Sequence, residues 1–251
     1  YDTLEVTLRS LEQQSYPSGR FEVVVVDNDT PSARRRDVEA DYDFVRQISE
    51  STQGSYAARN AGVEAATGDI LAFTDADCRP DRDWLTNGVG AFEDAPRVGL
   101  VGGALEIVTD GDGTDRAESP SAAEVWEMVR GFPQQHYIED LNFAATANML
   151  TRRSVFEEVG GFDDDLLSGG DREWGERVAE VGYELVYEGR ALVRHPARRE
   201  LRSLLNKHVR TTRGDYQRRN KRGELTNIGR IVGILEGAGE LAISPVKCFW
   251  A

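Results

Sequence analysis

Residues 68–77 read GDILAFTDAD, and this stretch decides the fold class. An apolar run from Ile70 to Phe73 ends abruptly in two carboxylates, Asp75 and Asp77. On a strand, this i, i+2 spacing puts both side chains on one face, and a bend beyond the strand lets them converge on one point. Such hard oxygen ligands suit Mg²⁺ or Mn²⁺, which keep few protein ligands and fill their other positions with substrate oxygens. The stretch therefore indicates a site for a metal ion and a phosphorylated substrate; an Asx turn after the strand is the alternative.

Strands and helices alternate on both sides of this stretch. Apolar periodicity predicts helices over 3–14, 56–66, 84–92, 122–129, 154–159, 171–181 and 201–209, and strands over 21–26, 44–48, 70–73, 98–107, 183–187 and 191–193. Residues 109–121 are acidic and rich in Gly and Ser, which indicates a surface loop. This order predicts an α/β fold with a doubly wound, mostly parallel central sheet flanked by helices, and with ligands beyond the carboxyl ends of the strands.

The composition is acidic and unusually poor in lysine. The 251 residues carry a formal net charge of −14, which argues against nucleic acid as a partner. The only lysines are Lys207, Lys221 and Lys247, so arginine supplies nearly all the positive charge. Acid excess with little lysine fits a halophilic protein from a salty cytoplasm, and a GC-rich genome that favours arginine is the alternative. No apolar run reaches the roughly 20 residues that cross a bilayer.

The two cysteines and the first residues set the expected cellular context. Cys78 and Cys248 are far apart and form no metal-type spacing, so we expect a reducing, cytoplasmic location, with Cys78 serving in packing. The chain starts at Tyr1 with neither a signal peptide nor a natural beginning, and we expect it to lack its true N-terminus.

One segment reverses the overall charge. Residues 190–222 contain twelve Arg and Lys but only two acids, Glu200 and Asp215. This predicts a surface that faces a donor diphosphate, a lipid phosphate or an anionic membrane. The alternative is a solvated face whose cations pair with acids elsewhere. The moderately apolar stretch 228–246 could be a packing helix, an interfacial helix or the approach to a membrane segment, and packing is the simplest interpretation.

Three further polar residues follow strands or open a helix. Asp27 ends the first strand, where it could form a turn or accept hydrogen bonds from a base or ribose. Asp171 follows Gly169 and Gly170 and opens a helix, where it could complete a capping box with Ser168 or take a proton from a hydroxyl. His195 ends a short strand; a lone histidine is usually structural, but near a metal it becomes a ligand.

These pieces, in order, resemble family 2 glycosyltransferases with the GT-A fold. The donor half of that family resembles VVVDND at 24–29, AARNAG at 57–62 and GDILAFTDAD at 68–77. Its acceptor half resembles ANMLTRRSVF at 147–156, VGGFD at 159–163 and GDREW at 170–174. The resemblance covers about residues 1–215, and the ordered series is far more specific than any one of its members.

The resemblance implies a role for each matching residue. Asp27 would bind the nucleobase of the donor, and Arg59 would lie near the donor site. Asp75 would contact the ribose or the metal shell, and Asp77 would coordinate the metal, Mn²⁺ or Mg²⁺. Asp171 would be the catalytic base. His195 matches a histidine that some members place near the metal or the diphosphate.

The chain also departs from the family pattern. Gly170 stands where many members have Glu, and the family's first strand is missing, with Tyr1 as the tail of its usual Pro-x-Tyr segment. We expect one GT-A domain over 1–215, with a nucleotide-sugar half over 1–108 and an acceptor half over 122–215. Residues 216–251 would form a C-terminal helical, membrane-proximal extension.

The resemblance implies a metal-dependent, inverting hexosyltransferase that moves a sugar from a nucleoside-diphosphate sugar to an acceptor hydroxyl. The donor expected for the family is a UDP-sugar, and the acceptor would be a glycan or a lipid-linked molecule. Two alternatives stay open: a nucleotidyltransferase, and a non-catalytic nucleotide-sugar-binding protein on a degenerate fold. The expected location is the cytoplasm, at the inner face of the membrane if the protein makes peripheral contact with it. The sequence does not tell the sugar, the nucleobase or the acceptor.

Overall fold

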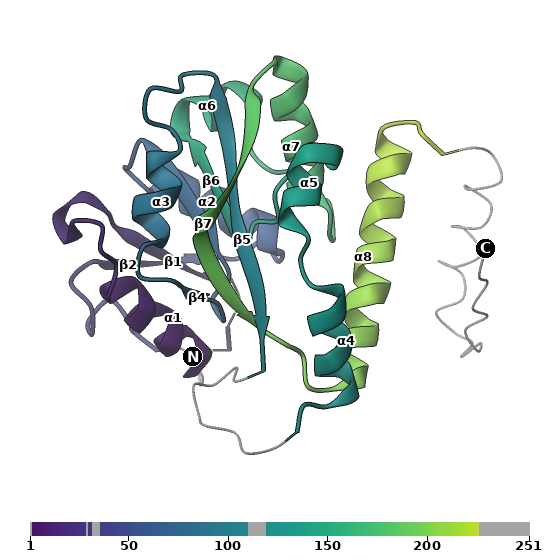
Figure 1. The fold of residues 1–251 in the computed structure, drawn as a ribbon, viewed down its shortest axis with the longest axis horizontal. Helices are drawn as coiled ribbons and strands as arrows, with labels where there is room; N and C mark the ends of the chain where they lie inside the picture. The colour runs from purple at the N-terminus through teal and green to yellow at the C-terminus, as the bar shows by residue number, and fades with distance from the viewer. Residues whose placement is uncertain (1, 29, 32–35, 110–118, 226–251) are drawn as a thin grey trace.

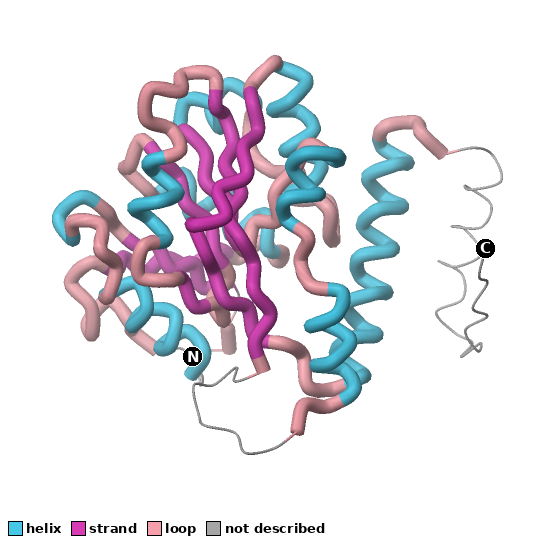
Figure 2. Tube along the Cα trace, in the orientation of Figure 1, coloured by secondary structure: helices cyan, strands magenta, loops and turns pink. Residues whose placement is uncertain are grey.

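The computed structural model describes residues 2–28, 30–31, 36–109 and 119–225. A five-stranded sheet runs through the centre of the molecule, with helices on both sides (Figures 1 and 2). Its order is β3-β6-β5-β7-β4, and the strands are β3 (Ile70–Thr74), β6 (Asn148–Arg152), β5 (Val98–Val108), β7 (Glu184–Pro196) and β4 (Arg79–Pro80). A second sheet pairs β1 (Val23–Asn28) with β2 (Val45–Glu50).

The α/β fold with a central sheet and flanking helices is confirmed, but its strand pairing is more mixed than the mostly parallel sheet we expected. β1 pairs parallel with β2, and β5 pairs parallel with β7. β6 runs antiparallel to both of its neighbours, β3 and β5, and β4 runs antiparallel to β7. Apolar patterning does not reveal this reversal, because a buried strand has the same apolar pattern in either direction.

Each helix that apolar periodicity predicted is present, but the helix Gln134–Leu141 was not predicted, and the last helix runs to Lys221, well past its predicted end at 209. The strands β6 and β4 were not predicted either. The strands predicted over 183–187 and 191–193 form one continuous strand, β7. The helices are α1 (Asp2–Glu12), α2 (Ser55–Ala65), α3 (Trp84–Gly90), α4 (Ala122–Arg130), α5 (Gln134–Leu141), α6 (Arg153–Val159), α7 (Gly170–Val181) and α8 (Leu201–Lys221), with a short 3₁₀ turn, η1, at Ser18–Arg20.

Asn148 ties the middle of the central sheet together. Its fully buried side chain donates hydrogen bonds to the carbonyl oxygens of Ala104 and Ala191, both at 2.8 Å, and so joins β6 to β5 and β7. Its Oδ1 atom accepts the indole N–H of Trp84 at 2.8 Å, which holds α3 against the sheet. Because every polar atom of this amide is used, its burial adds specificity without an unsatisfied group.

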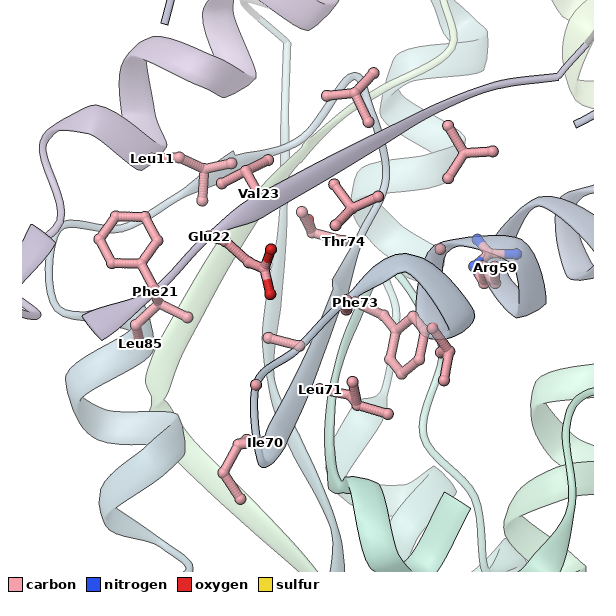
Figure 3. Close-up of a pocket in the computed structure, with 18 of the residues that line it drawn as sticks. Leu11, Phe21, Glu22, Val23, Arg59, Ile70, Leu71, Phe73, Thr74 and Leu85 are labelled. Carbon is pink, nitrogen blue, oxygen red and sulfur yellow. The ribbon is translucent and has the colours of Figure 1, made fainter. Parts of the chain in front are cut away.

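A groove of about 680 Å³ separates β1 from β3 (Figure 3). One wall is residues 21–26 and the other is residues 68–76, with Leu8 and Leu11 of α1 at its base. The two strands belong to different sheets, so these facing edges are not paired with each other. No further strand, such as the family's first strand, lies between them in the described ranges. The groove reaches the candidate site, since Arg59 and Asp75 are among its lining residues.

The C-terminal part of the described chain is a single long helix. α8 continues past residue 215 to Lys221, so the expected domain boundary falls inside a helix. Among the described residues, no helix combines the length and the apolarity that a membrane span requires. The stretch 228–246, Cys248 and most of the expected 216–251 extension lie outside the described residues, as does most of the loop expected at 109–121.

Candidate active site

The two carboxylates that follow β3 lie on a tight turn. The Cys78 N–H donates to the carbonyl oxygen of Asp75 at 3.0 Å, which closes this turn. The buried hydroxyl of Thr7, on α1, lies 2.7 Å from the Cys78 carbonyl oxygen and 3.0 Å from that of Ala76. Helix α1 therefore fixes the loop that carries Asp75 and Asp77.

β4 brings this loop to the end of β7. Arg79 pairs with Arg194, so the residues next to them, Cys78 and His195, become neighbours. Ligand atoms of Asp75, Asp77, Cys78 and His195 all lie within 4.8 Å of one another. The fold thus gathers the three residues predicted for a metal site, although His195 lies more than a hundred positions along the chain from the two aspartates.

The orientation of His195 suits a metal ligand. The side chain is buried, and its Nδ1 atom lies 2.8 Å from the Pro196 carbonyl oxygen. A carbonyl can only accept, so Nδ1 carries the proton and Nε2 keeps its lone pair. Two carboxylates and one such imidazole make a donor set that fits Mn²⁺ or Mg²⁺. Cys78 adds little to this set, because burial raises the pKa of its thiol far above the usual range and keeps it protonated.

A chain of contacts links the metal-type cluster to Asp171. Arg59, on α2, donates to Asp75 Oδ1 at 2.8 Å. Its guanidinium carbon lies 5.6 Å from the centre of the Tyr56 ring, a cation–π distance. The Tyr56 hydroxyl in turn lies 3.5 Å from Asp171 Oδ1. Two intervening side chains therefore connect Asp75 with Asp171, although the two carboxylates come from opposite halves of the chain.

Asp171 has the environment expected of a proton acceptor. Burial raises the pKa of this carboxyl above its usual range, and the charge of Asp75 adds to the rise. The cation of Arg59 and the N–H of Arg172, which donates to Oδ1 at 2.9 Å, oppose that rise. A carboxylate with a raised pKa is a stronger base than one free in water.

The start of α7 does not use the capping box that the sequence offered. Its N-cap residue is Gly169, in the left-handed region with φ of 79°, so Ser168 does not occupy the N-cap position. The N–H groups of the first turn instead donate to the Tyr56 hydroxyl, from Gly170, and to Asp171 Oδ1, from Arg172.

Tyr56 explains why residue 170 is glycine. A Cβ atom on Gly170 would come within 2.8 Å of the Tyr56 ring. The Gly170 N–H donates to the Tyr56 hydroxyl at 2.8 Å, so the ring packs directly on the backbone. The space that a side chain at 170 would need is filled by an aromatic side chain from α2.

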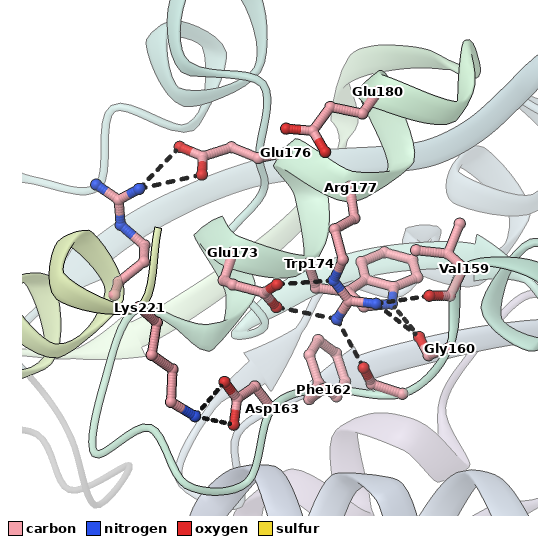
Figure 4. A network of polar contacts seen from close by, with 12 residues as sticks. Val159, Gly160, Phe162, Asp163, Glu173, Trp174, Glu176, Arg177, Glu180 and Lys221 are labelled. Atoms are coloured by element: carbon pink, nitrogen blue, oxygen red, sulfur yellow. Dashed lines mark hydrogen bonds and ion pairs between the residues drawn. The ribbon is translucent and has the colours of Figure 1, made fainter. Parts of the chain in front are cut away.

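An ion-pair network anchors α7 against the loop after α6 (Figure 4). Arg177 bonds both carboxylate oxygens of Glu173, at 2.8 and 2.9 Å, and donates to the carbonyl oxygens of Val159 and Gly161 at 2.6 and 2.7 Å. The Trp174 indole N–H donates to the Gly160 carbonyl oxygen at 2.8 Å. These bonds fix the helix whose first turn presents Asp171.

Asp27 lies at the end of β1, as predicted. Its side chain is buried, and Oδ1 accepts the Thr30 N–H at 3.0 Å, which is the turn-forming role. Asp27 is not a member of the metal-type cluster or of the Arg59–Tyr56–Asp171 contacts. The proposed contact with a nucleobase stays a prediction.

Sequence reasoning missed three residues of this region. Tyr56 and Tyr137 stand near Asp171, whose charge, together with burial, raises the pKa of both phenols. Thr7 holds the metal-type loop. A tyrosine at the start of an alanine-rich helix, three residues before Arg59, was the one usable signal, because i, i+3 positions share a helix face.

A mixed α/β sheet with acidic residues after its strands, a metal-type cluster and a facing carboxylate define the class: a GT-A glycosyltransferase. The chain belongs to glycosyl transferase family 2, whose family model matches residues 1–160.

Curated proteins that are similar in sequence to this chain are also described as glycosyltransferases. The chain is 36% identical to glycosyltransferase AglE of Haloferax volcanii over 220 residues, which cover 86% of this chain and 69% of that protein. It is 34% identical over 151 residues to a pre-mycofactocin glycosyltransferase of Mycobacterium tuberculosis, covering 60% of this chain and 32% of that protein. It is 27% identical over 208 residues to the glucosyl-dolichyl phosphate glucuronosyltransferase of Haloferax volcanii, covering 78% of this chain and 64% of that protein. The chain thus spans from a third to about two thirds of these relatives.

Solved structures agree on the fold. A mannosyltransferase from Pyrobaculum calidifontis, in complex with GDP-Man and Mn²⁺, matches with a TM-score of 0.63 and 23% identity, covering 94% of this chain and 65% of that one. TarS of S. aureus, in complex with UDP-GlcNAc, matches with a TM-score of 0.57 and 18% identity, covering 80% of this chain and 57% of that one. Both are similar to this chain in fold, and each of them was solved in complex with a nucleotide sugar.

Proposed function

We propose that this glycosyltransferase is a metal-dependent, inverting hexosyltransferase that moves a sugar from a nucleoside-diphosphate sugar to an acceptor hydroxyl. The observation that carries the proposal is the contact chain from Asp75 through Arg59 and Tyr56 to Asp171. This contact chain supports a site in which the metal-type cluster and the basic carboxylate of Asp171 act on the two sides of a bound sugar. Inverting transfer needs this arrangement, since the leaving group and the attacking hydroxyl lie on opposite sides of the anomeric carbon.

In this mechanism Asp77, Asp75 and His195 would hold Mn²⁺ or Mg²⁺. The metal, when bound, neutralises charge on the departing nucleoside diphosphate. Asp171 accepts the proton of the acceptor hydroxyl as its oxygen attacks the anomeric carbon. Tyr56 orients Asp171, and Arg59 supplies a fixed positive charge between the two sides of the cleft.

Asp27 would bind the nucleobase at the end of β1. We propose UDP as the nucleotide, on the family prior. The structural neighbours carry GDP-Man in one case and UDP-GlcNAc in another, so a donor screen must include both bases.

The acceptor is a hydroxyl on a lipid-linked sugar or on a polysaccharide. One relative's name contains a dolichyl phosphate, and another is a poly-β-1,6-N-acetylglucosamine synthase. We favour the lipid-linked class and a location in the cytoplasm at the inner membrane face. The acidic, lysine-poor composition supports a salt-rich cytoplasm, and a salt titration of the free energy of unfolding tests this.

The experiment is a panel of radiolabelled nucleotide sugars with Mn²⁺ or Mg²⁺ and simple glycoside acceptors. Release of nucleoside diphosphate with a product of inverted anomeric configuration supports the proposal. Release of pyrophosphate from a nucleoside triphosphate and a sugar phosphate would mean a nucleotidyltransferase. Tight donor binding with no turnover on any acceptor would mean a non-catalytic binding protein.

A further inference from the structure

The outer face of α8 carries an apolar stripe. Leu201, Leu205 and Val209 follow one another every four residues and are 63%, 52% and 52% exposed. The buried residues Gly214 and Arg218 lie on the opposite face of the same helix, and the buried Leu204 lies between the two faces. An ordinary surface helix has the reverse arrangement, with its apolar side chains inward.

Helix α4 is inverted in the same way. Val129 is 80% exposed and Val125 lies on the same face, four residues earlier, while Glu124 and Glu127 point inward and are buried. The inward acids have partners: Glu127 accepts from Arg198 at 2.9 Å and from Lys207 at 2.8 Å. The protein therefore buries charge on this helix and leaves its apolar side chains outside.

The two helices lie side by side (Figure 1), with the rings of Trp126 and His208 in contact between them. Their exposed apolar residues form one surface, which we call the α4/α8 face: Val125, Val129, Leu201, Leu205 and Val209.

The charges around the α4/α8 face are positive. Most cations of the 190–222 segment are used in ion pairs; Arg198 and Lys207 pair with Glu127, Arg218 and Arg222 with Glu176, and Lys221 with Asp163. Arg202 and Arg210 are exposed on α8 and form no ion pair within the described part of the chain, and Arg202 lies directly beside the apolar stripe. On a chain with a net charge of −14, the cations that stay available are next to exposed leucine and valine.

The α4/α8 face is connected to the candidate active site. A cavity of about 160 Å³ lies between α4, α5 and α8 and is lined by Trp126, Phe132, Tyr137 and Lys207, among others. The Phe132 ring packs 5.2 Å from that of His195, so this cavity lies next to the metal-type cluster.

We propose that the α4/α8 face docks on the surface of an anionic lipid bilayer. Apolar side chains flanked by arginine match the boundary between acyl chains and negative headgroups. A second copy of the chain fits less well, since a two-fold interface would set the same arginines against each other. The docking stands on the face alone; that it presents a lipid-linked acceptor to Asp171 rests on the proposed function.

The test is flotation of the full chain with vesicles made of equal parts phosphatidylglycerol and phosphatidylcholine, compared with vesicles of phosphatidylcholine alone. We expect binding to the anionic vesicles at about 0.1 M salt, and weaker binding at about 1 M, where the Debye length falls to about 3 Å. Leu205→Glu should lower the bound fraction by about tenfold or more, and Arg202→Glu/Arg210→Glu should lower it similarly. Val181→Glu, at a half-exposed apolar residue on α7, is the matched control and should bind as the parent does.

Circular dichroism checks that each variant is folded, and sedimentation velocity measures the oligomeric state without vesicles. Absence of vesicle binding by the parent chain, or equal binding by parent and Leu205→Glu, would overturn the proposal. A parent dimer that Leu205→Glu converts to a non-floating monomer would also overturn it, in favour of an interface between copies. Donor turnover on a water-soluble acceptor is assayed in parallel: normal turnover without flotation rejects the docking alone, and flotation without turnover rejects the proposed function alone.

Discussion

The Tyr56 hydroxyl lies 3.5 Å from Asp171 Oδ1 and, on its other side, accepts the Gly170 N–H at 2.8 Å. This one hydroxyl joins the donor half of the chain to the first turn of α7. It supplies a hydrogen bond to the charged form of Asp171 and so favours ionisation of that carboxyl.

Tyr56→Phe keeps the ring but removes the hydroxyl. We expect the acidic limb of the pH–rate profile to move to higher pH, because Asp171 loses a donor to its charged form. The free energy of unfolding should fall by about 1–2 kcal/mol, since the Gly170 N–H loses its acceptor. Tyr42→Phe, whose hydroxyl bonds Glu5 at 3.1 Å away from the site, is the control. A pH profile that does not move in Tyr56→Phe would remove Tyr56 from this role.

Asp171→Asn should raise the melting temperature of the metal-free protein at pH 7. Burial raises the pKa of Asp171 above its unfolded value, so the native state holds the proton more tightly than the unfolded chain. The native state is therefore favoured below the unfolded pKa, and that advantage is lost as the pH rises through the folded pKa. An asparagine side chain carries no charge, so the Asp171→Asn variant does not lose stability in this way as the pH rises. Thermal unfolding of the parent and of Asp171→Asn, measured across pH, tests this effect. The melting temperature of the variant should exceed that of the parent at pH 7, and the difference should fade in acid. A variant that melts below the parent at pH 7 would contradict the account.

Asp77→Asn should weaken Mn²⁺ binding by at least about 100-fold, since it removes a charged ligand from a site with few protein ligands. Calorimetric titration of Mn²⁺ in the presence of a nucleoside diphosphate measures the change. Asp83→Asn is a matched control, because Asp83 is exposed beyond β4, at the start of α3, and its side chain makes no capping bond. Equal Mn²⁺ affinity in the parent and Asp77→Asn would take Asp77 out of the metal site.

Arg177→Ala should destabilise the protein by about 2–3 kcal/mol. The change leaves the carboxylate of Glu173 without its cationic partner and the carbonyl oxygens of Val159 and Gly161 without their donor. Arg97→Ala breaks a pair with Glu184 in which both side chains are mostly exposed, and it should cost less than about 1 kcal/mol. Urea unfolding of both variants tests the contrast, and equal losses would show that the network does not anchor α7.

The positions of helices and strands were predictable where apolar periodicity was strong. The run before Asp75 and the stripe on α7 both led to the observed elements. The direction of β6 was not predictable, because a strand buried on both faces reads the same either way. The inverted α4 was not predictable either: the pattern shows that one face is apolar, but not that the buried face is the one with Glu124 and Glu127.

The residues of the candidate site also differ in how far the sequence alone could indicate them. Asp75, Asp77 and Asp171 were found because each lies at the end of an element with a clear pattern. His195 joins them only through the pairing of β4 with β7, a two-residue strand that no periodicity marks. The contact of Tyr56 with Gly170 is a tertiary packing event, which one sequence read by itself does not contain.

The central claim is that Asp171 accepts the proton of the acceptor hydroxyl in a site assembled with Asp75 and Asp77. The most direct test is Asp171→Asn, with transfer rate and donor affinity measured on the same preparation. The account predicts that donor affinity with Mn²⁺ stays within about twofold while transfer falls by roughly 10²–10⁴. Transfer at the parent rate in a folded Asp171→Asn protein would contradict it.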